Sequence, residues 1–282
     1  MGDVNFLINN GVDIEKSLEL FGDMATYNDT IGEFLLGANE KIPKIKYYKE
    51  MKDMPNYAIL VHSLKSDARY FGFTKLAELA YNHELKSKEG DYYYIYENFD
   101  SLMNEADRII LLVKQYMGKE PINNIPSDIT INIENTIQQK ENLEEFSMAE
   151  IYTEKTILVV DDSNIVRNFV KRIFEGQYKV GVAKDGKEAI DIISANKEND
   201  TLVGVLLDLN MPNVDGFAVL DYMKNNNLFY NIPVSIISGD STKVTIDRAF
   251  TYQIVDMLGK PFTESDVKRV VEKTIYLKEM NN

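Results

Sequence analysis

The chain has 282 residues, of which 44% are hydrophobic, and a formal net charge of −14 at pH 7. That length is enough for about two globular domains. The negative charge argues against nucleic acid or an anionic membrane surface as a partner. Because the chain has no cysteine, a disulfide framework and a thiolate zinc site are both excluded. No signal peptide or membrane-length apolar stretch is apparent, so we expect a cytoplasmic protein without membrane insertion.

Residues 1–117 show helical periodicity without strand alternation. Pro43 is expected to kink the second helix or end it early, whereas Pro55 suits the first turn of the third. The expected helices cover residues 12–22, 25–51, 55–72, 73–88 and 92–117. Short connections between long helices predict an all-α antiparallel bundle.

Residues 118–153 differ in composition, being rich in Asn, Glu, Gln, Ile and Pro. This composition is typical of a linker, and a short helix between Glu134 and Glu145 remains open. Residues 154–282 then alternate between apolar runs and helical patterns. Strands are expected near 156–160, 178–182, 202–207, 233–237 and 254–258, and helices near 163–174, 186–195, 215–225, 241–251 and 263–278. Such alternation predicts one doubly wound α/β domain with a parallel sheet.

Polar residues follow four of these apolar runs. Asp161 and Asp162 follow the first, Asp208 the third, Ser238 the fourth and Lys260 the fifth. The carboxyl ends of parallel strands meet at one edge of a sheet, where ligands bind. Each residue taken alone has an ordinary structural explanation, such as helix capping by the Asp-Asp pair. Together they predict a pocket for a divalent metal and a phosphoryl group.

The order and spacing of these residues resemble the receiver domain of two-component response regulators, over roughly residues 155–280. The resemblance implies a flavodoxin-like (βα)5 fold with strand order 2-1-3-4-5. It implies that Asp208 is the phosphoacceptor and that Mg2+ is held by Asp161, Asp162, Asp208 and the backbone carbonyl of Asn210. Ser238 would bond a phosphoryl oxygen and Lys260 would pair with the phosphoryl group. The protein would then act in signalling, catalysing only its own phosphorylation and hydrolysis.

Two positions near the lysine call for comment. The family usually carries an aromatic residue three positions before it, and this chain has Met257. Met257 either simply packs or belongs to an altered switch, and the sequence leaves both open. Lys260-Pro261 is expected to be a cis peptide bond, as in the family.

A helical wheel separates two faces of the third helix, on which His62 lies. Lys65, Ser66 and Arg69 fall within about 60° of His62. The apolar stripe falls on the opposite face and comprises Tyr57, Leu60, Leu64, Ala68 and Phe71. We therefore expect His62 to point outward, where it is either a functional residue or an ordinary surface histidine.

His62, Lys65, Ser66, Ala68 and Gly72 resemble the signature of a histidine phosphotransfer (HPt) domain, over roughly residues 4–117. The resemblance implies that His62 accepts a phosphoryl group on Nε2 and that Lys65 offsets its charge. The family usually has glycine where this chain has Ser66, which leaves the docking geometry open. By contrast, His83 falls on an apolar face and is expected to be a partly buried structural residue.

The leading hypothesis is a phosphorelay protein in which phosphoryl groups move between His62 and Asp208, within the chain or through other proteins. No ATP-binding motif is apparent, so the donor would be a sensor histidine kinase, another phosphorelay protein or a small phosphodonor. Whether the two domains dock on each other is left open. The alternative is a phosphorylation-controlled binding switch whose helical domain docks a partner without phosphotransfer. A receiver phosphatase is disfavoured, because Asp67 falls on the wrong part of the wheel to orient water.

Overall fold

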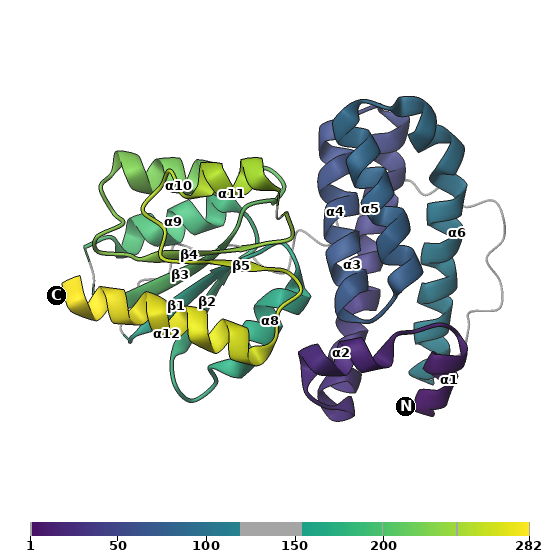
Figure 1. Ribbon diagram of the computed structural model, residues 1–282, viewed down its shortest axis with the longest axis horizontal. Coiled ribbons are helices and arrows are strands. Elements are labelled where there is room, and N and C mark those ends of the chain that lie inside the picture. The colour runs from purple at the N-terminus through teal and green to yellow at the C-terminus, as the bar shows by residue number, and fades with distance from the viewer. Residues whose placement is uncertain (1, 119–153, 199, 241, 282) are drawn as a thin grey trace, which may run out of the picture.

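The computed structural model describes residues 2–118, 154–198, 200–240 and 242–281. The first half of the chain forms a helical part and the second half an α/β part (Figure 1). The predicted linker lies outside the described residues, apart from Gly118. Among the described residues, no helix is long and apolar enough to span a bilayer.

Within the described residues, six helices form the first part, and the four long ones pack side by side (Figure 1). They are α1 (Val4–Asn9), α2 (Ile14–Phe21), α3 (Met24–Glu50), α4 (Met54–Tyr70), α5 (Thr74–Glu89) and α6 (Tyr92–Tyr116). Five begin at an aspartate whose side chain accepts a hydrogen bond from a backbone N–H of the first turn. The predicted bundle is confirmed, but α1 was missed because six residues are too few for a periodic pattern. The early end at Pro43 was wrong, since α3 continues to Glu50.

The α/β part is a parallel sheet with helices on both faces. Its strands are β1 (Thr156–Val160), β2 (Lys179–Ala183), β3 (Leu202–Asp208), β4 (Val234–Ser238) and β5 (Met257–Gly259). Its helices are α8 (Asn164–Ile173), α9 (Gly186–Asn196), α10 (Gly216–Asn225), α11 (Lys243–Ala249) and α12 (Glu264–Asn281). The order β2-β1-β3-β4-β5 confirms the predicted flavodoxin-like topology. Helices α8 and α12 cover one face and α9, α10 and α11 the other (Figure 1), so β1, β3 and β4 are buried along their whole length.

The last strand begins later than predicted, at Met257 rather than near residue 254. Backbone pairing nevertheless starts earlier, because Val255 N–H donates to Val234 O and Ile236 N–H donates to Asp256 O. Lys260-Pro261, just beyond this strand, is a cis peptide bond as predicted.

The two parts dock on each other, which the sequence left open. Helix α3 lies beside α8 (Figure 1), and the ring of Phe21 meets that of Phe169 at 6.0 Å. Tyr70 meets Phe262 at 5.9 Å between ring centroids. Buried residues of α2, α3 and α4 belong to the same continuous apolar cluster as residues of α8 and α12. Helix α4, which carries His62, therefore faces the α/β part.

Candidate phosphorylation and phosphotransfer site

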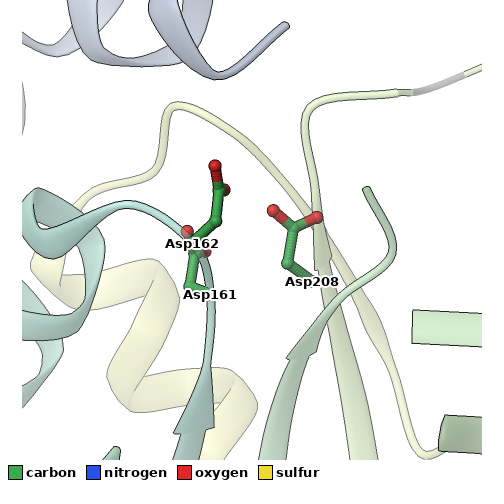
Figure 2. Close-up of side chains that lie close together, drawn as sticks. All are labelled: Asp161, Asp162 and Asp208. Atoms are coloured by element: carbon green, nitrogen blue, oxygen red, sulfur yellow. The ribbon is translucent and has the colours of Figure 1, made fainter. Parts of the chain in front are cut away.

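Three aspartates converge at the carboxyl end of the sheet (Figure 2). Asp161 and Asp162 follow β1 and Asp208 ends β3, so adjacent parallel strands bring them to one rim. One carboxylate oxygen from each lies within 4.8 Å of the others. Asp161 and Asp208 are fully buried, whereas Asp162 is half-buried. Figure 2 shows Asp162 and Asp208 projecting into a common space.

Lys260 reaches this cluster from the end of β5. Its Nζ lies 2.5 Å from Asp208 Oδ2 and 2.5 Å from Asp161 Oδ2. The contact with Asp208 is a hydrogen bond, and the contact with Asp161 is a buried ion pair. The backbone N–H of Lys260 donates to Ser238 O at 2.8 Å, which ties the lysine to the end of β4.

The remaining residues of the receiver resemblance lie around the same rim. Ser238 ends β4, is buried, and its Oγ accepts a hydrogen bond from Asp240 N–H at 3.1 Å. The backbone N–H of Asn210 donates to Asp208 Oδ1 at 3.1 Å. Met257 is half-buried and packs against the apolar cluster on the α9–α10 face of the sheet. The strand-end positions in the sequence had predicted Ser238 at this rim, and the receiver resemblance had placed Asn210 there.

The charges in this pocket are strongly coupled. Burial raises the pKa of the Asp161 carboxyl to about 7, and the neighbouring Asp208 and Asp162 charges add to the rise while Lys260 opposes it. Burial alone would lower the pKa of Lys260, but the carboxylates around it hold that pKa above its usual range. Removing three carboxylates from water around one lysine leaves net negative charge, which favours a cation.

The donor set fits Mg2+. Three carboxylates within 4.8 Å supply hard oxygen ligands, which this ion prefers. Asp161 Oδ2 lies in an ion pair with Lys260 Nζ, and a carboxylate oxygen keeps a further lone pair that can ligate a cation. Asp161, Asp162 and Asp208 would hold the ion, with the carbonyl of Asn210 as the further ligand implied by the resemblance.

His62 lies on α4 at the contact between the two parts of the chain. Its exposed fraction is only 3%. The prediction that His62 would be exposed to solvent was therefore wrong. The wheel correctly separated His62 from the apolar stripe, but the α/β part covers the remaining face. A Cβ added to Gly239, in the loop after β4, would lie 3.0 Å from His62 Nε2. Lys65 and Ser66 are buried with it.

A carboxylate on the next helix orients the His62 ring. His62 Nδ1 lies 2.8 Å from Glu84 Oε1, and Lys65 Nζ donates to Glu84 Oε2 at 2.6 Å. We assign the proton to Nδ1, because a carboxylate can only accept, and this leaves the lone pair on Nε2. Burial disfavours the Glu84 charge, but hydrogen bonds from His62 and Lys65 lower its pKa below the usual range. Nothing in the sequence pattern marked Glu84, which lies 22 residues from His62.

Asp67 also faces the α/β part, contrary to the wheel. Its Oδ1 accepts a hydrogen bond from Ser163 Oγ at 2.8 Å, and its Oδ2 pairs with Lys41 Nζ at 2.5 Å. Burial would lower the pKa of Lys41, but Asp67 together with Asp162 and Asp161 raises it. Both Lys41 and Asp67 are buried, and sequence reasoning missed the first and misplaced the second.

His83 is fully buried, as expected for a structural residue. Its Nδ1 accepts a hydrogen bond from Tyr57 OH at 2.7 Å, and its Nε2 donates to Asn98 O at 3.3 Å. Burial lowers the pKa of the His83 imidazole to about 4.

Residues 157–272 match the family model of the response regulator receiver domain. Among curated proteins, the two-component response regulator ARR5 of Arabidopsis thaliana is 30% identical over 132 residues, covering 44% of this chain and 72% of that protein. The probable methanogenesis regulatory protein FilR2 of Methanothrix harundinacea is 32% identical over 124 residues, covering 42% and 79%. Among solved structures, the receiver domain of the Francisella response regulator 1452 is 26% identical with a TM-score of 0.39, covering 46% of this chain and all of that one. The family model falls on the α/β part.

Proposed function

This chain belongs to the response regulator receiver family, and from that premise we propose that it is a two-component phosphorelay protein. Asp208 accepts a phosphoryl group, with Mg2+ held by Asp161, Asp162, Asp208 and Asn210. His62 carries a phosphoryl group on the helical part, which functions as an HPt domain. The protein acts in signalling rather than in metabolic turnover, and its partners are a sensor histidine kinase or other phosphorelay proteins.

The convergence of Asp208, Lys260 and two further aspartates carries the receiver half of this proposal. A carboxylate attacking an anionic phosphoryl group needs its charge neutralised, and bound Mg2+ supplies much of that neutralisation. Lys260 supplies a further positive charge, and the Ser238 hydroxyl lies at the end of the neighbouring strand. Positioning and charge thus replace a general base, which the reaction does not require.

The ring of His62 supports the HPt half. Glu84 fixes the Nδ1 proton, and Nε2 is buried with no hydrogen-bond partner. A buried polar atom without a partner costs stability, so it asks for a functional explanation. Nε2 bearing a lone pair is the nucleophile that phosphohistidine formation needs.

Labelling with radioactive acetyl phosphate and Mg2+ tests the proposal. The wild-type chain is expected to acquire both acid-stable, base-labile label on Asp208 and base-stable label on His62. Asp208→Asn is expected to lose both labels, because acetyl phosphate loads Asp208 and the label reaches His62 from there. His62→Gln is expected to lose the base-stable label alone, and chelation of Mg2+ abolishes labelling of Asp208. An unlabelled wild-type chain, or label that survives Asp208→Asn in the acyl phosphate fraction, would contradict the receiver assignment.

The alternative is a binding switch without phosphotransfer, in which the helical part only docks. Ser66, where HPt domains usually have glycine, and the burial of His62 under the receiver favour it. Phosphotransfer profiling against candidate sensor kinases separates the two functions. If His62 is never labelled while Asp208 is, the switch is correct and the relay is wrong.

A further inference from the structure

We infer that Ser66 and Gly239 form a steric pair that restricts His62 to a receiver without a side chain directly after its β4 serine. The receiver of this same chain meets that condition, so it is the intramolecular partner of His62. The inference rests on the proposed function and specifies the partner of its histidine.

The pair is defined by close contacts across the boundary between the two parts. A Cβ built on Gly239 would lie 3.0 Å from His62 Nε2, 3.1 Å from its Cε1 and 3.3 Å from Ser66 Oγ. These distances are tighter than ordinary van der Waals contact. Gly239 is not among the glycines with positive φ, so its backbone would accept another residue. The position therefore needs glycine for space rather than for conformation.

The same contact explains the departure at Ser66. The side chain of Ser66 fills space that a glycine would leave for an incoming receiver. On the receiver side of the contact, Gly239 has no side chain and leaves space for the Ser66 hydroxyl. The larger residue at position 66 is thus matched by the smallest residue at position 239. A receiver with alanine at the equivalent of Gly239 would push His62 and Ser66 aside by a few tenths of an ångström, and a larger residue would push them further. This crowding gives specificity by exclusion.

The surroundings suit transfer at this point. Gly239 directly follows Ser238, the last residue of β4. His62 Nε2 therefore lies against the loop that begins at the edge of the sheet where the three aspartates converge. A cavity of about 520 Å3 beside the contact is lined by the cationic side chains of Lys65, Arg69 and Lys88, together with the carboxylates of Glu84 and Asp240. Cations near the transferring group offset its negative charge.

The transfer balances without another reactant once Asp208 is phosphorylated. The Nε2 lone pair of His62 attacks phosphorus and forms the P–N bond. The P–O bond to Asp208 breaks, and its electron pair restores the Asp208 carboxylate. The Nδ1 proton stays on the ring, in its hydrogen bond to Glu84. The reverse step uses the same atoms.

The test loads Asp208 of the full chain with radioactive acetyl phosphate and Mg2+, then follows base-stable label on His62. Transfer within one chain should be independent of protein concentration, and a mixture of His62→Gln and Asp208→Asn chains should transfer far more slowly. We expect Gly239→Ala to slow transfer about tenfold and Gly239→Val about 100-fold, the scale of a misplacement of about 1 Å. Gly259→Ala, where an added Cβ meets nothing within 4 Å, is the matched control and should transfer normally.

The decisive measurement is the double variant. Ser66→Gly should restore much of the transfer lost in Gly239→Ala, because the added Cβ can move into the vacated volume. Loading of Asp208 by acetyl phosphate, measured in the His62→Gln background, should be unaffected by Gly239→Ala, since a small donor does not meet this contact.

Several outcomes would overturn the inference. They are normal or faster transfer in Gly239→Val, no rescue by Ser66→Gly, and transfer whose rate rises with protein concentration. Absence of label on Asp208 in the wild type would instead contradict the proposed function. In that case the steric pair is tested separately by diethyl pyrocarbonate, because Gly239→Val should expose His62 to acylation and Ser66→Gly in that variant should reduce it.

Discussion

At the scale of single residues, the most consequential group outside the expected motifs is Glu84. It is buried, with its Oε1 2.8 Å from His62 Nδ1 and 2.6 Å from Lys88 Nζ. Glu84 contacts Nδ1 of His62 rather than Nε2, so under the proposed function it is a positioning residue. The Glu84 carboxylate holds the imidazole of His62 in one tautomer. It also neutralises the charge of Lys88.

Replacing Glu84 with Gln should slow labelling of His62 by about tenfold or more, as with other carboxylates that orient a histidine. The physical reason is a weakened preference for the Nδ1–H tautomer. The 15N chemical shifts of the ring should report one tautomer in the wild type and a mixture in the variant. Glu89→Gln is the matched control, because Glu89 is exposed on the same helix and pairs with the half-buried Lys86. Unchanged tautomer and rate in Glu84→Gln would show that Glu84 is merely structural.

Because His83 is buried, we expect the stability of the helical part to fall at acid pH. The folded-state pKa of His83, about 4, lies below the 6.5 of an unperturbed histidine, so the unfolded chain binds the proton more readily. Stability from this group is therefore full above pH 6.5 and declines as the pH falls toward 4. The loss reaches about 3 kcal/mol, at about 1.4 kcal/mol for each pH unit. Urea unfolding of wild type and His83→Gln at several pH values checks this, since the variant should lack that part of the decline.

At the scale of elements, Gly72 sets the packing of α2 against the end of α4. Its φ is +71°, and an added Cβ would lie 2.2 Å from Asp13 O. The Gly72 carbonyl also accepts a hydrogen bond from Asp13 N–H at 2.9 Å. The tenth residue after His62 thus has a structural reason to be glycine, independent of phosphotransfer.

Gly72→Ala should destabilise the helical part by about 3 kcal/mol, because left-handed strain and a backbone clash act together. Gly90→Ala is the control, since Gly90 has a φ of +74° but an added Cβ would meet nothing within 4 Å. Thermal unfolding of both variants separates the two causes. Equal losses would mean that the contact with Asp13 contributes nothing.

The sequence predicted those elements and residues that depend on local pattern. Strand runs ended close to where the structure ends them, so Asp161, Asp208 and Lys260 were placed at one rim by topology alone. The contacts of Glu84 and Lys41 could not be found in this way, because each depends on how separate helices pack. The helical wheel assumed that only the apolar face of α4 is buried, against the other helices. In the structure the docked receiver also buries the opposite face, on which His62 lies.

At the scale of the whole molecule, the docked receiver closes the face of α4 that carries His62. Both histidines of the chain are consequently buried, His62 between the two parts and His83 inside the bundle. The contact contains aromatic pairs and polar links, including Ser163 to Asp67 and Arg172 to Thr30. The receiver family accounts for the α/β part, and docking accounts for the state of the histidine.

Phe169→Ala should loosen this docking, because Phe169 meets Phe21 and Phe262 across and beside the boundary. His62 should then react with diethyl pyrocarbonate about tenfold faster than in the wild type, while His83 stays protected as an internal control. The tenfold estimate corresponds to a loss of about 1.4 kcal/mol of docking free energy. Mass spectrometry locates the modified histidine, and equal protection of His62 in both proteins would contradict the docked arrangement.

The burial of His62 also bears on how quickly a second protein can reach it. Under the proposed function, an outside receiver that exchanges a phosphoryl group with the imidazole must wait until the two halves separate. Its rate on this substrate then has a ceiling set by spontaneous opening. Raising the concentration of that outside receiver speeds the exchange only up to that ceiling.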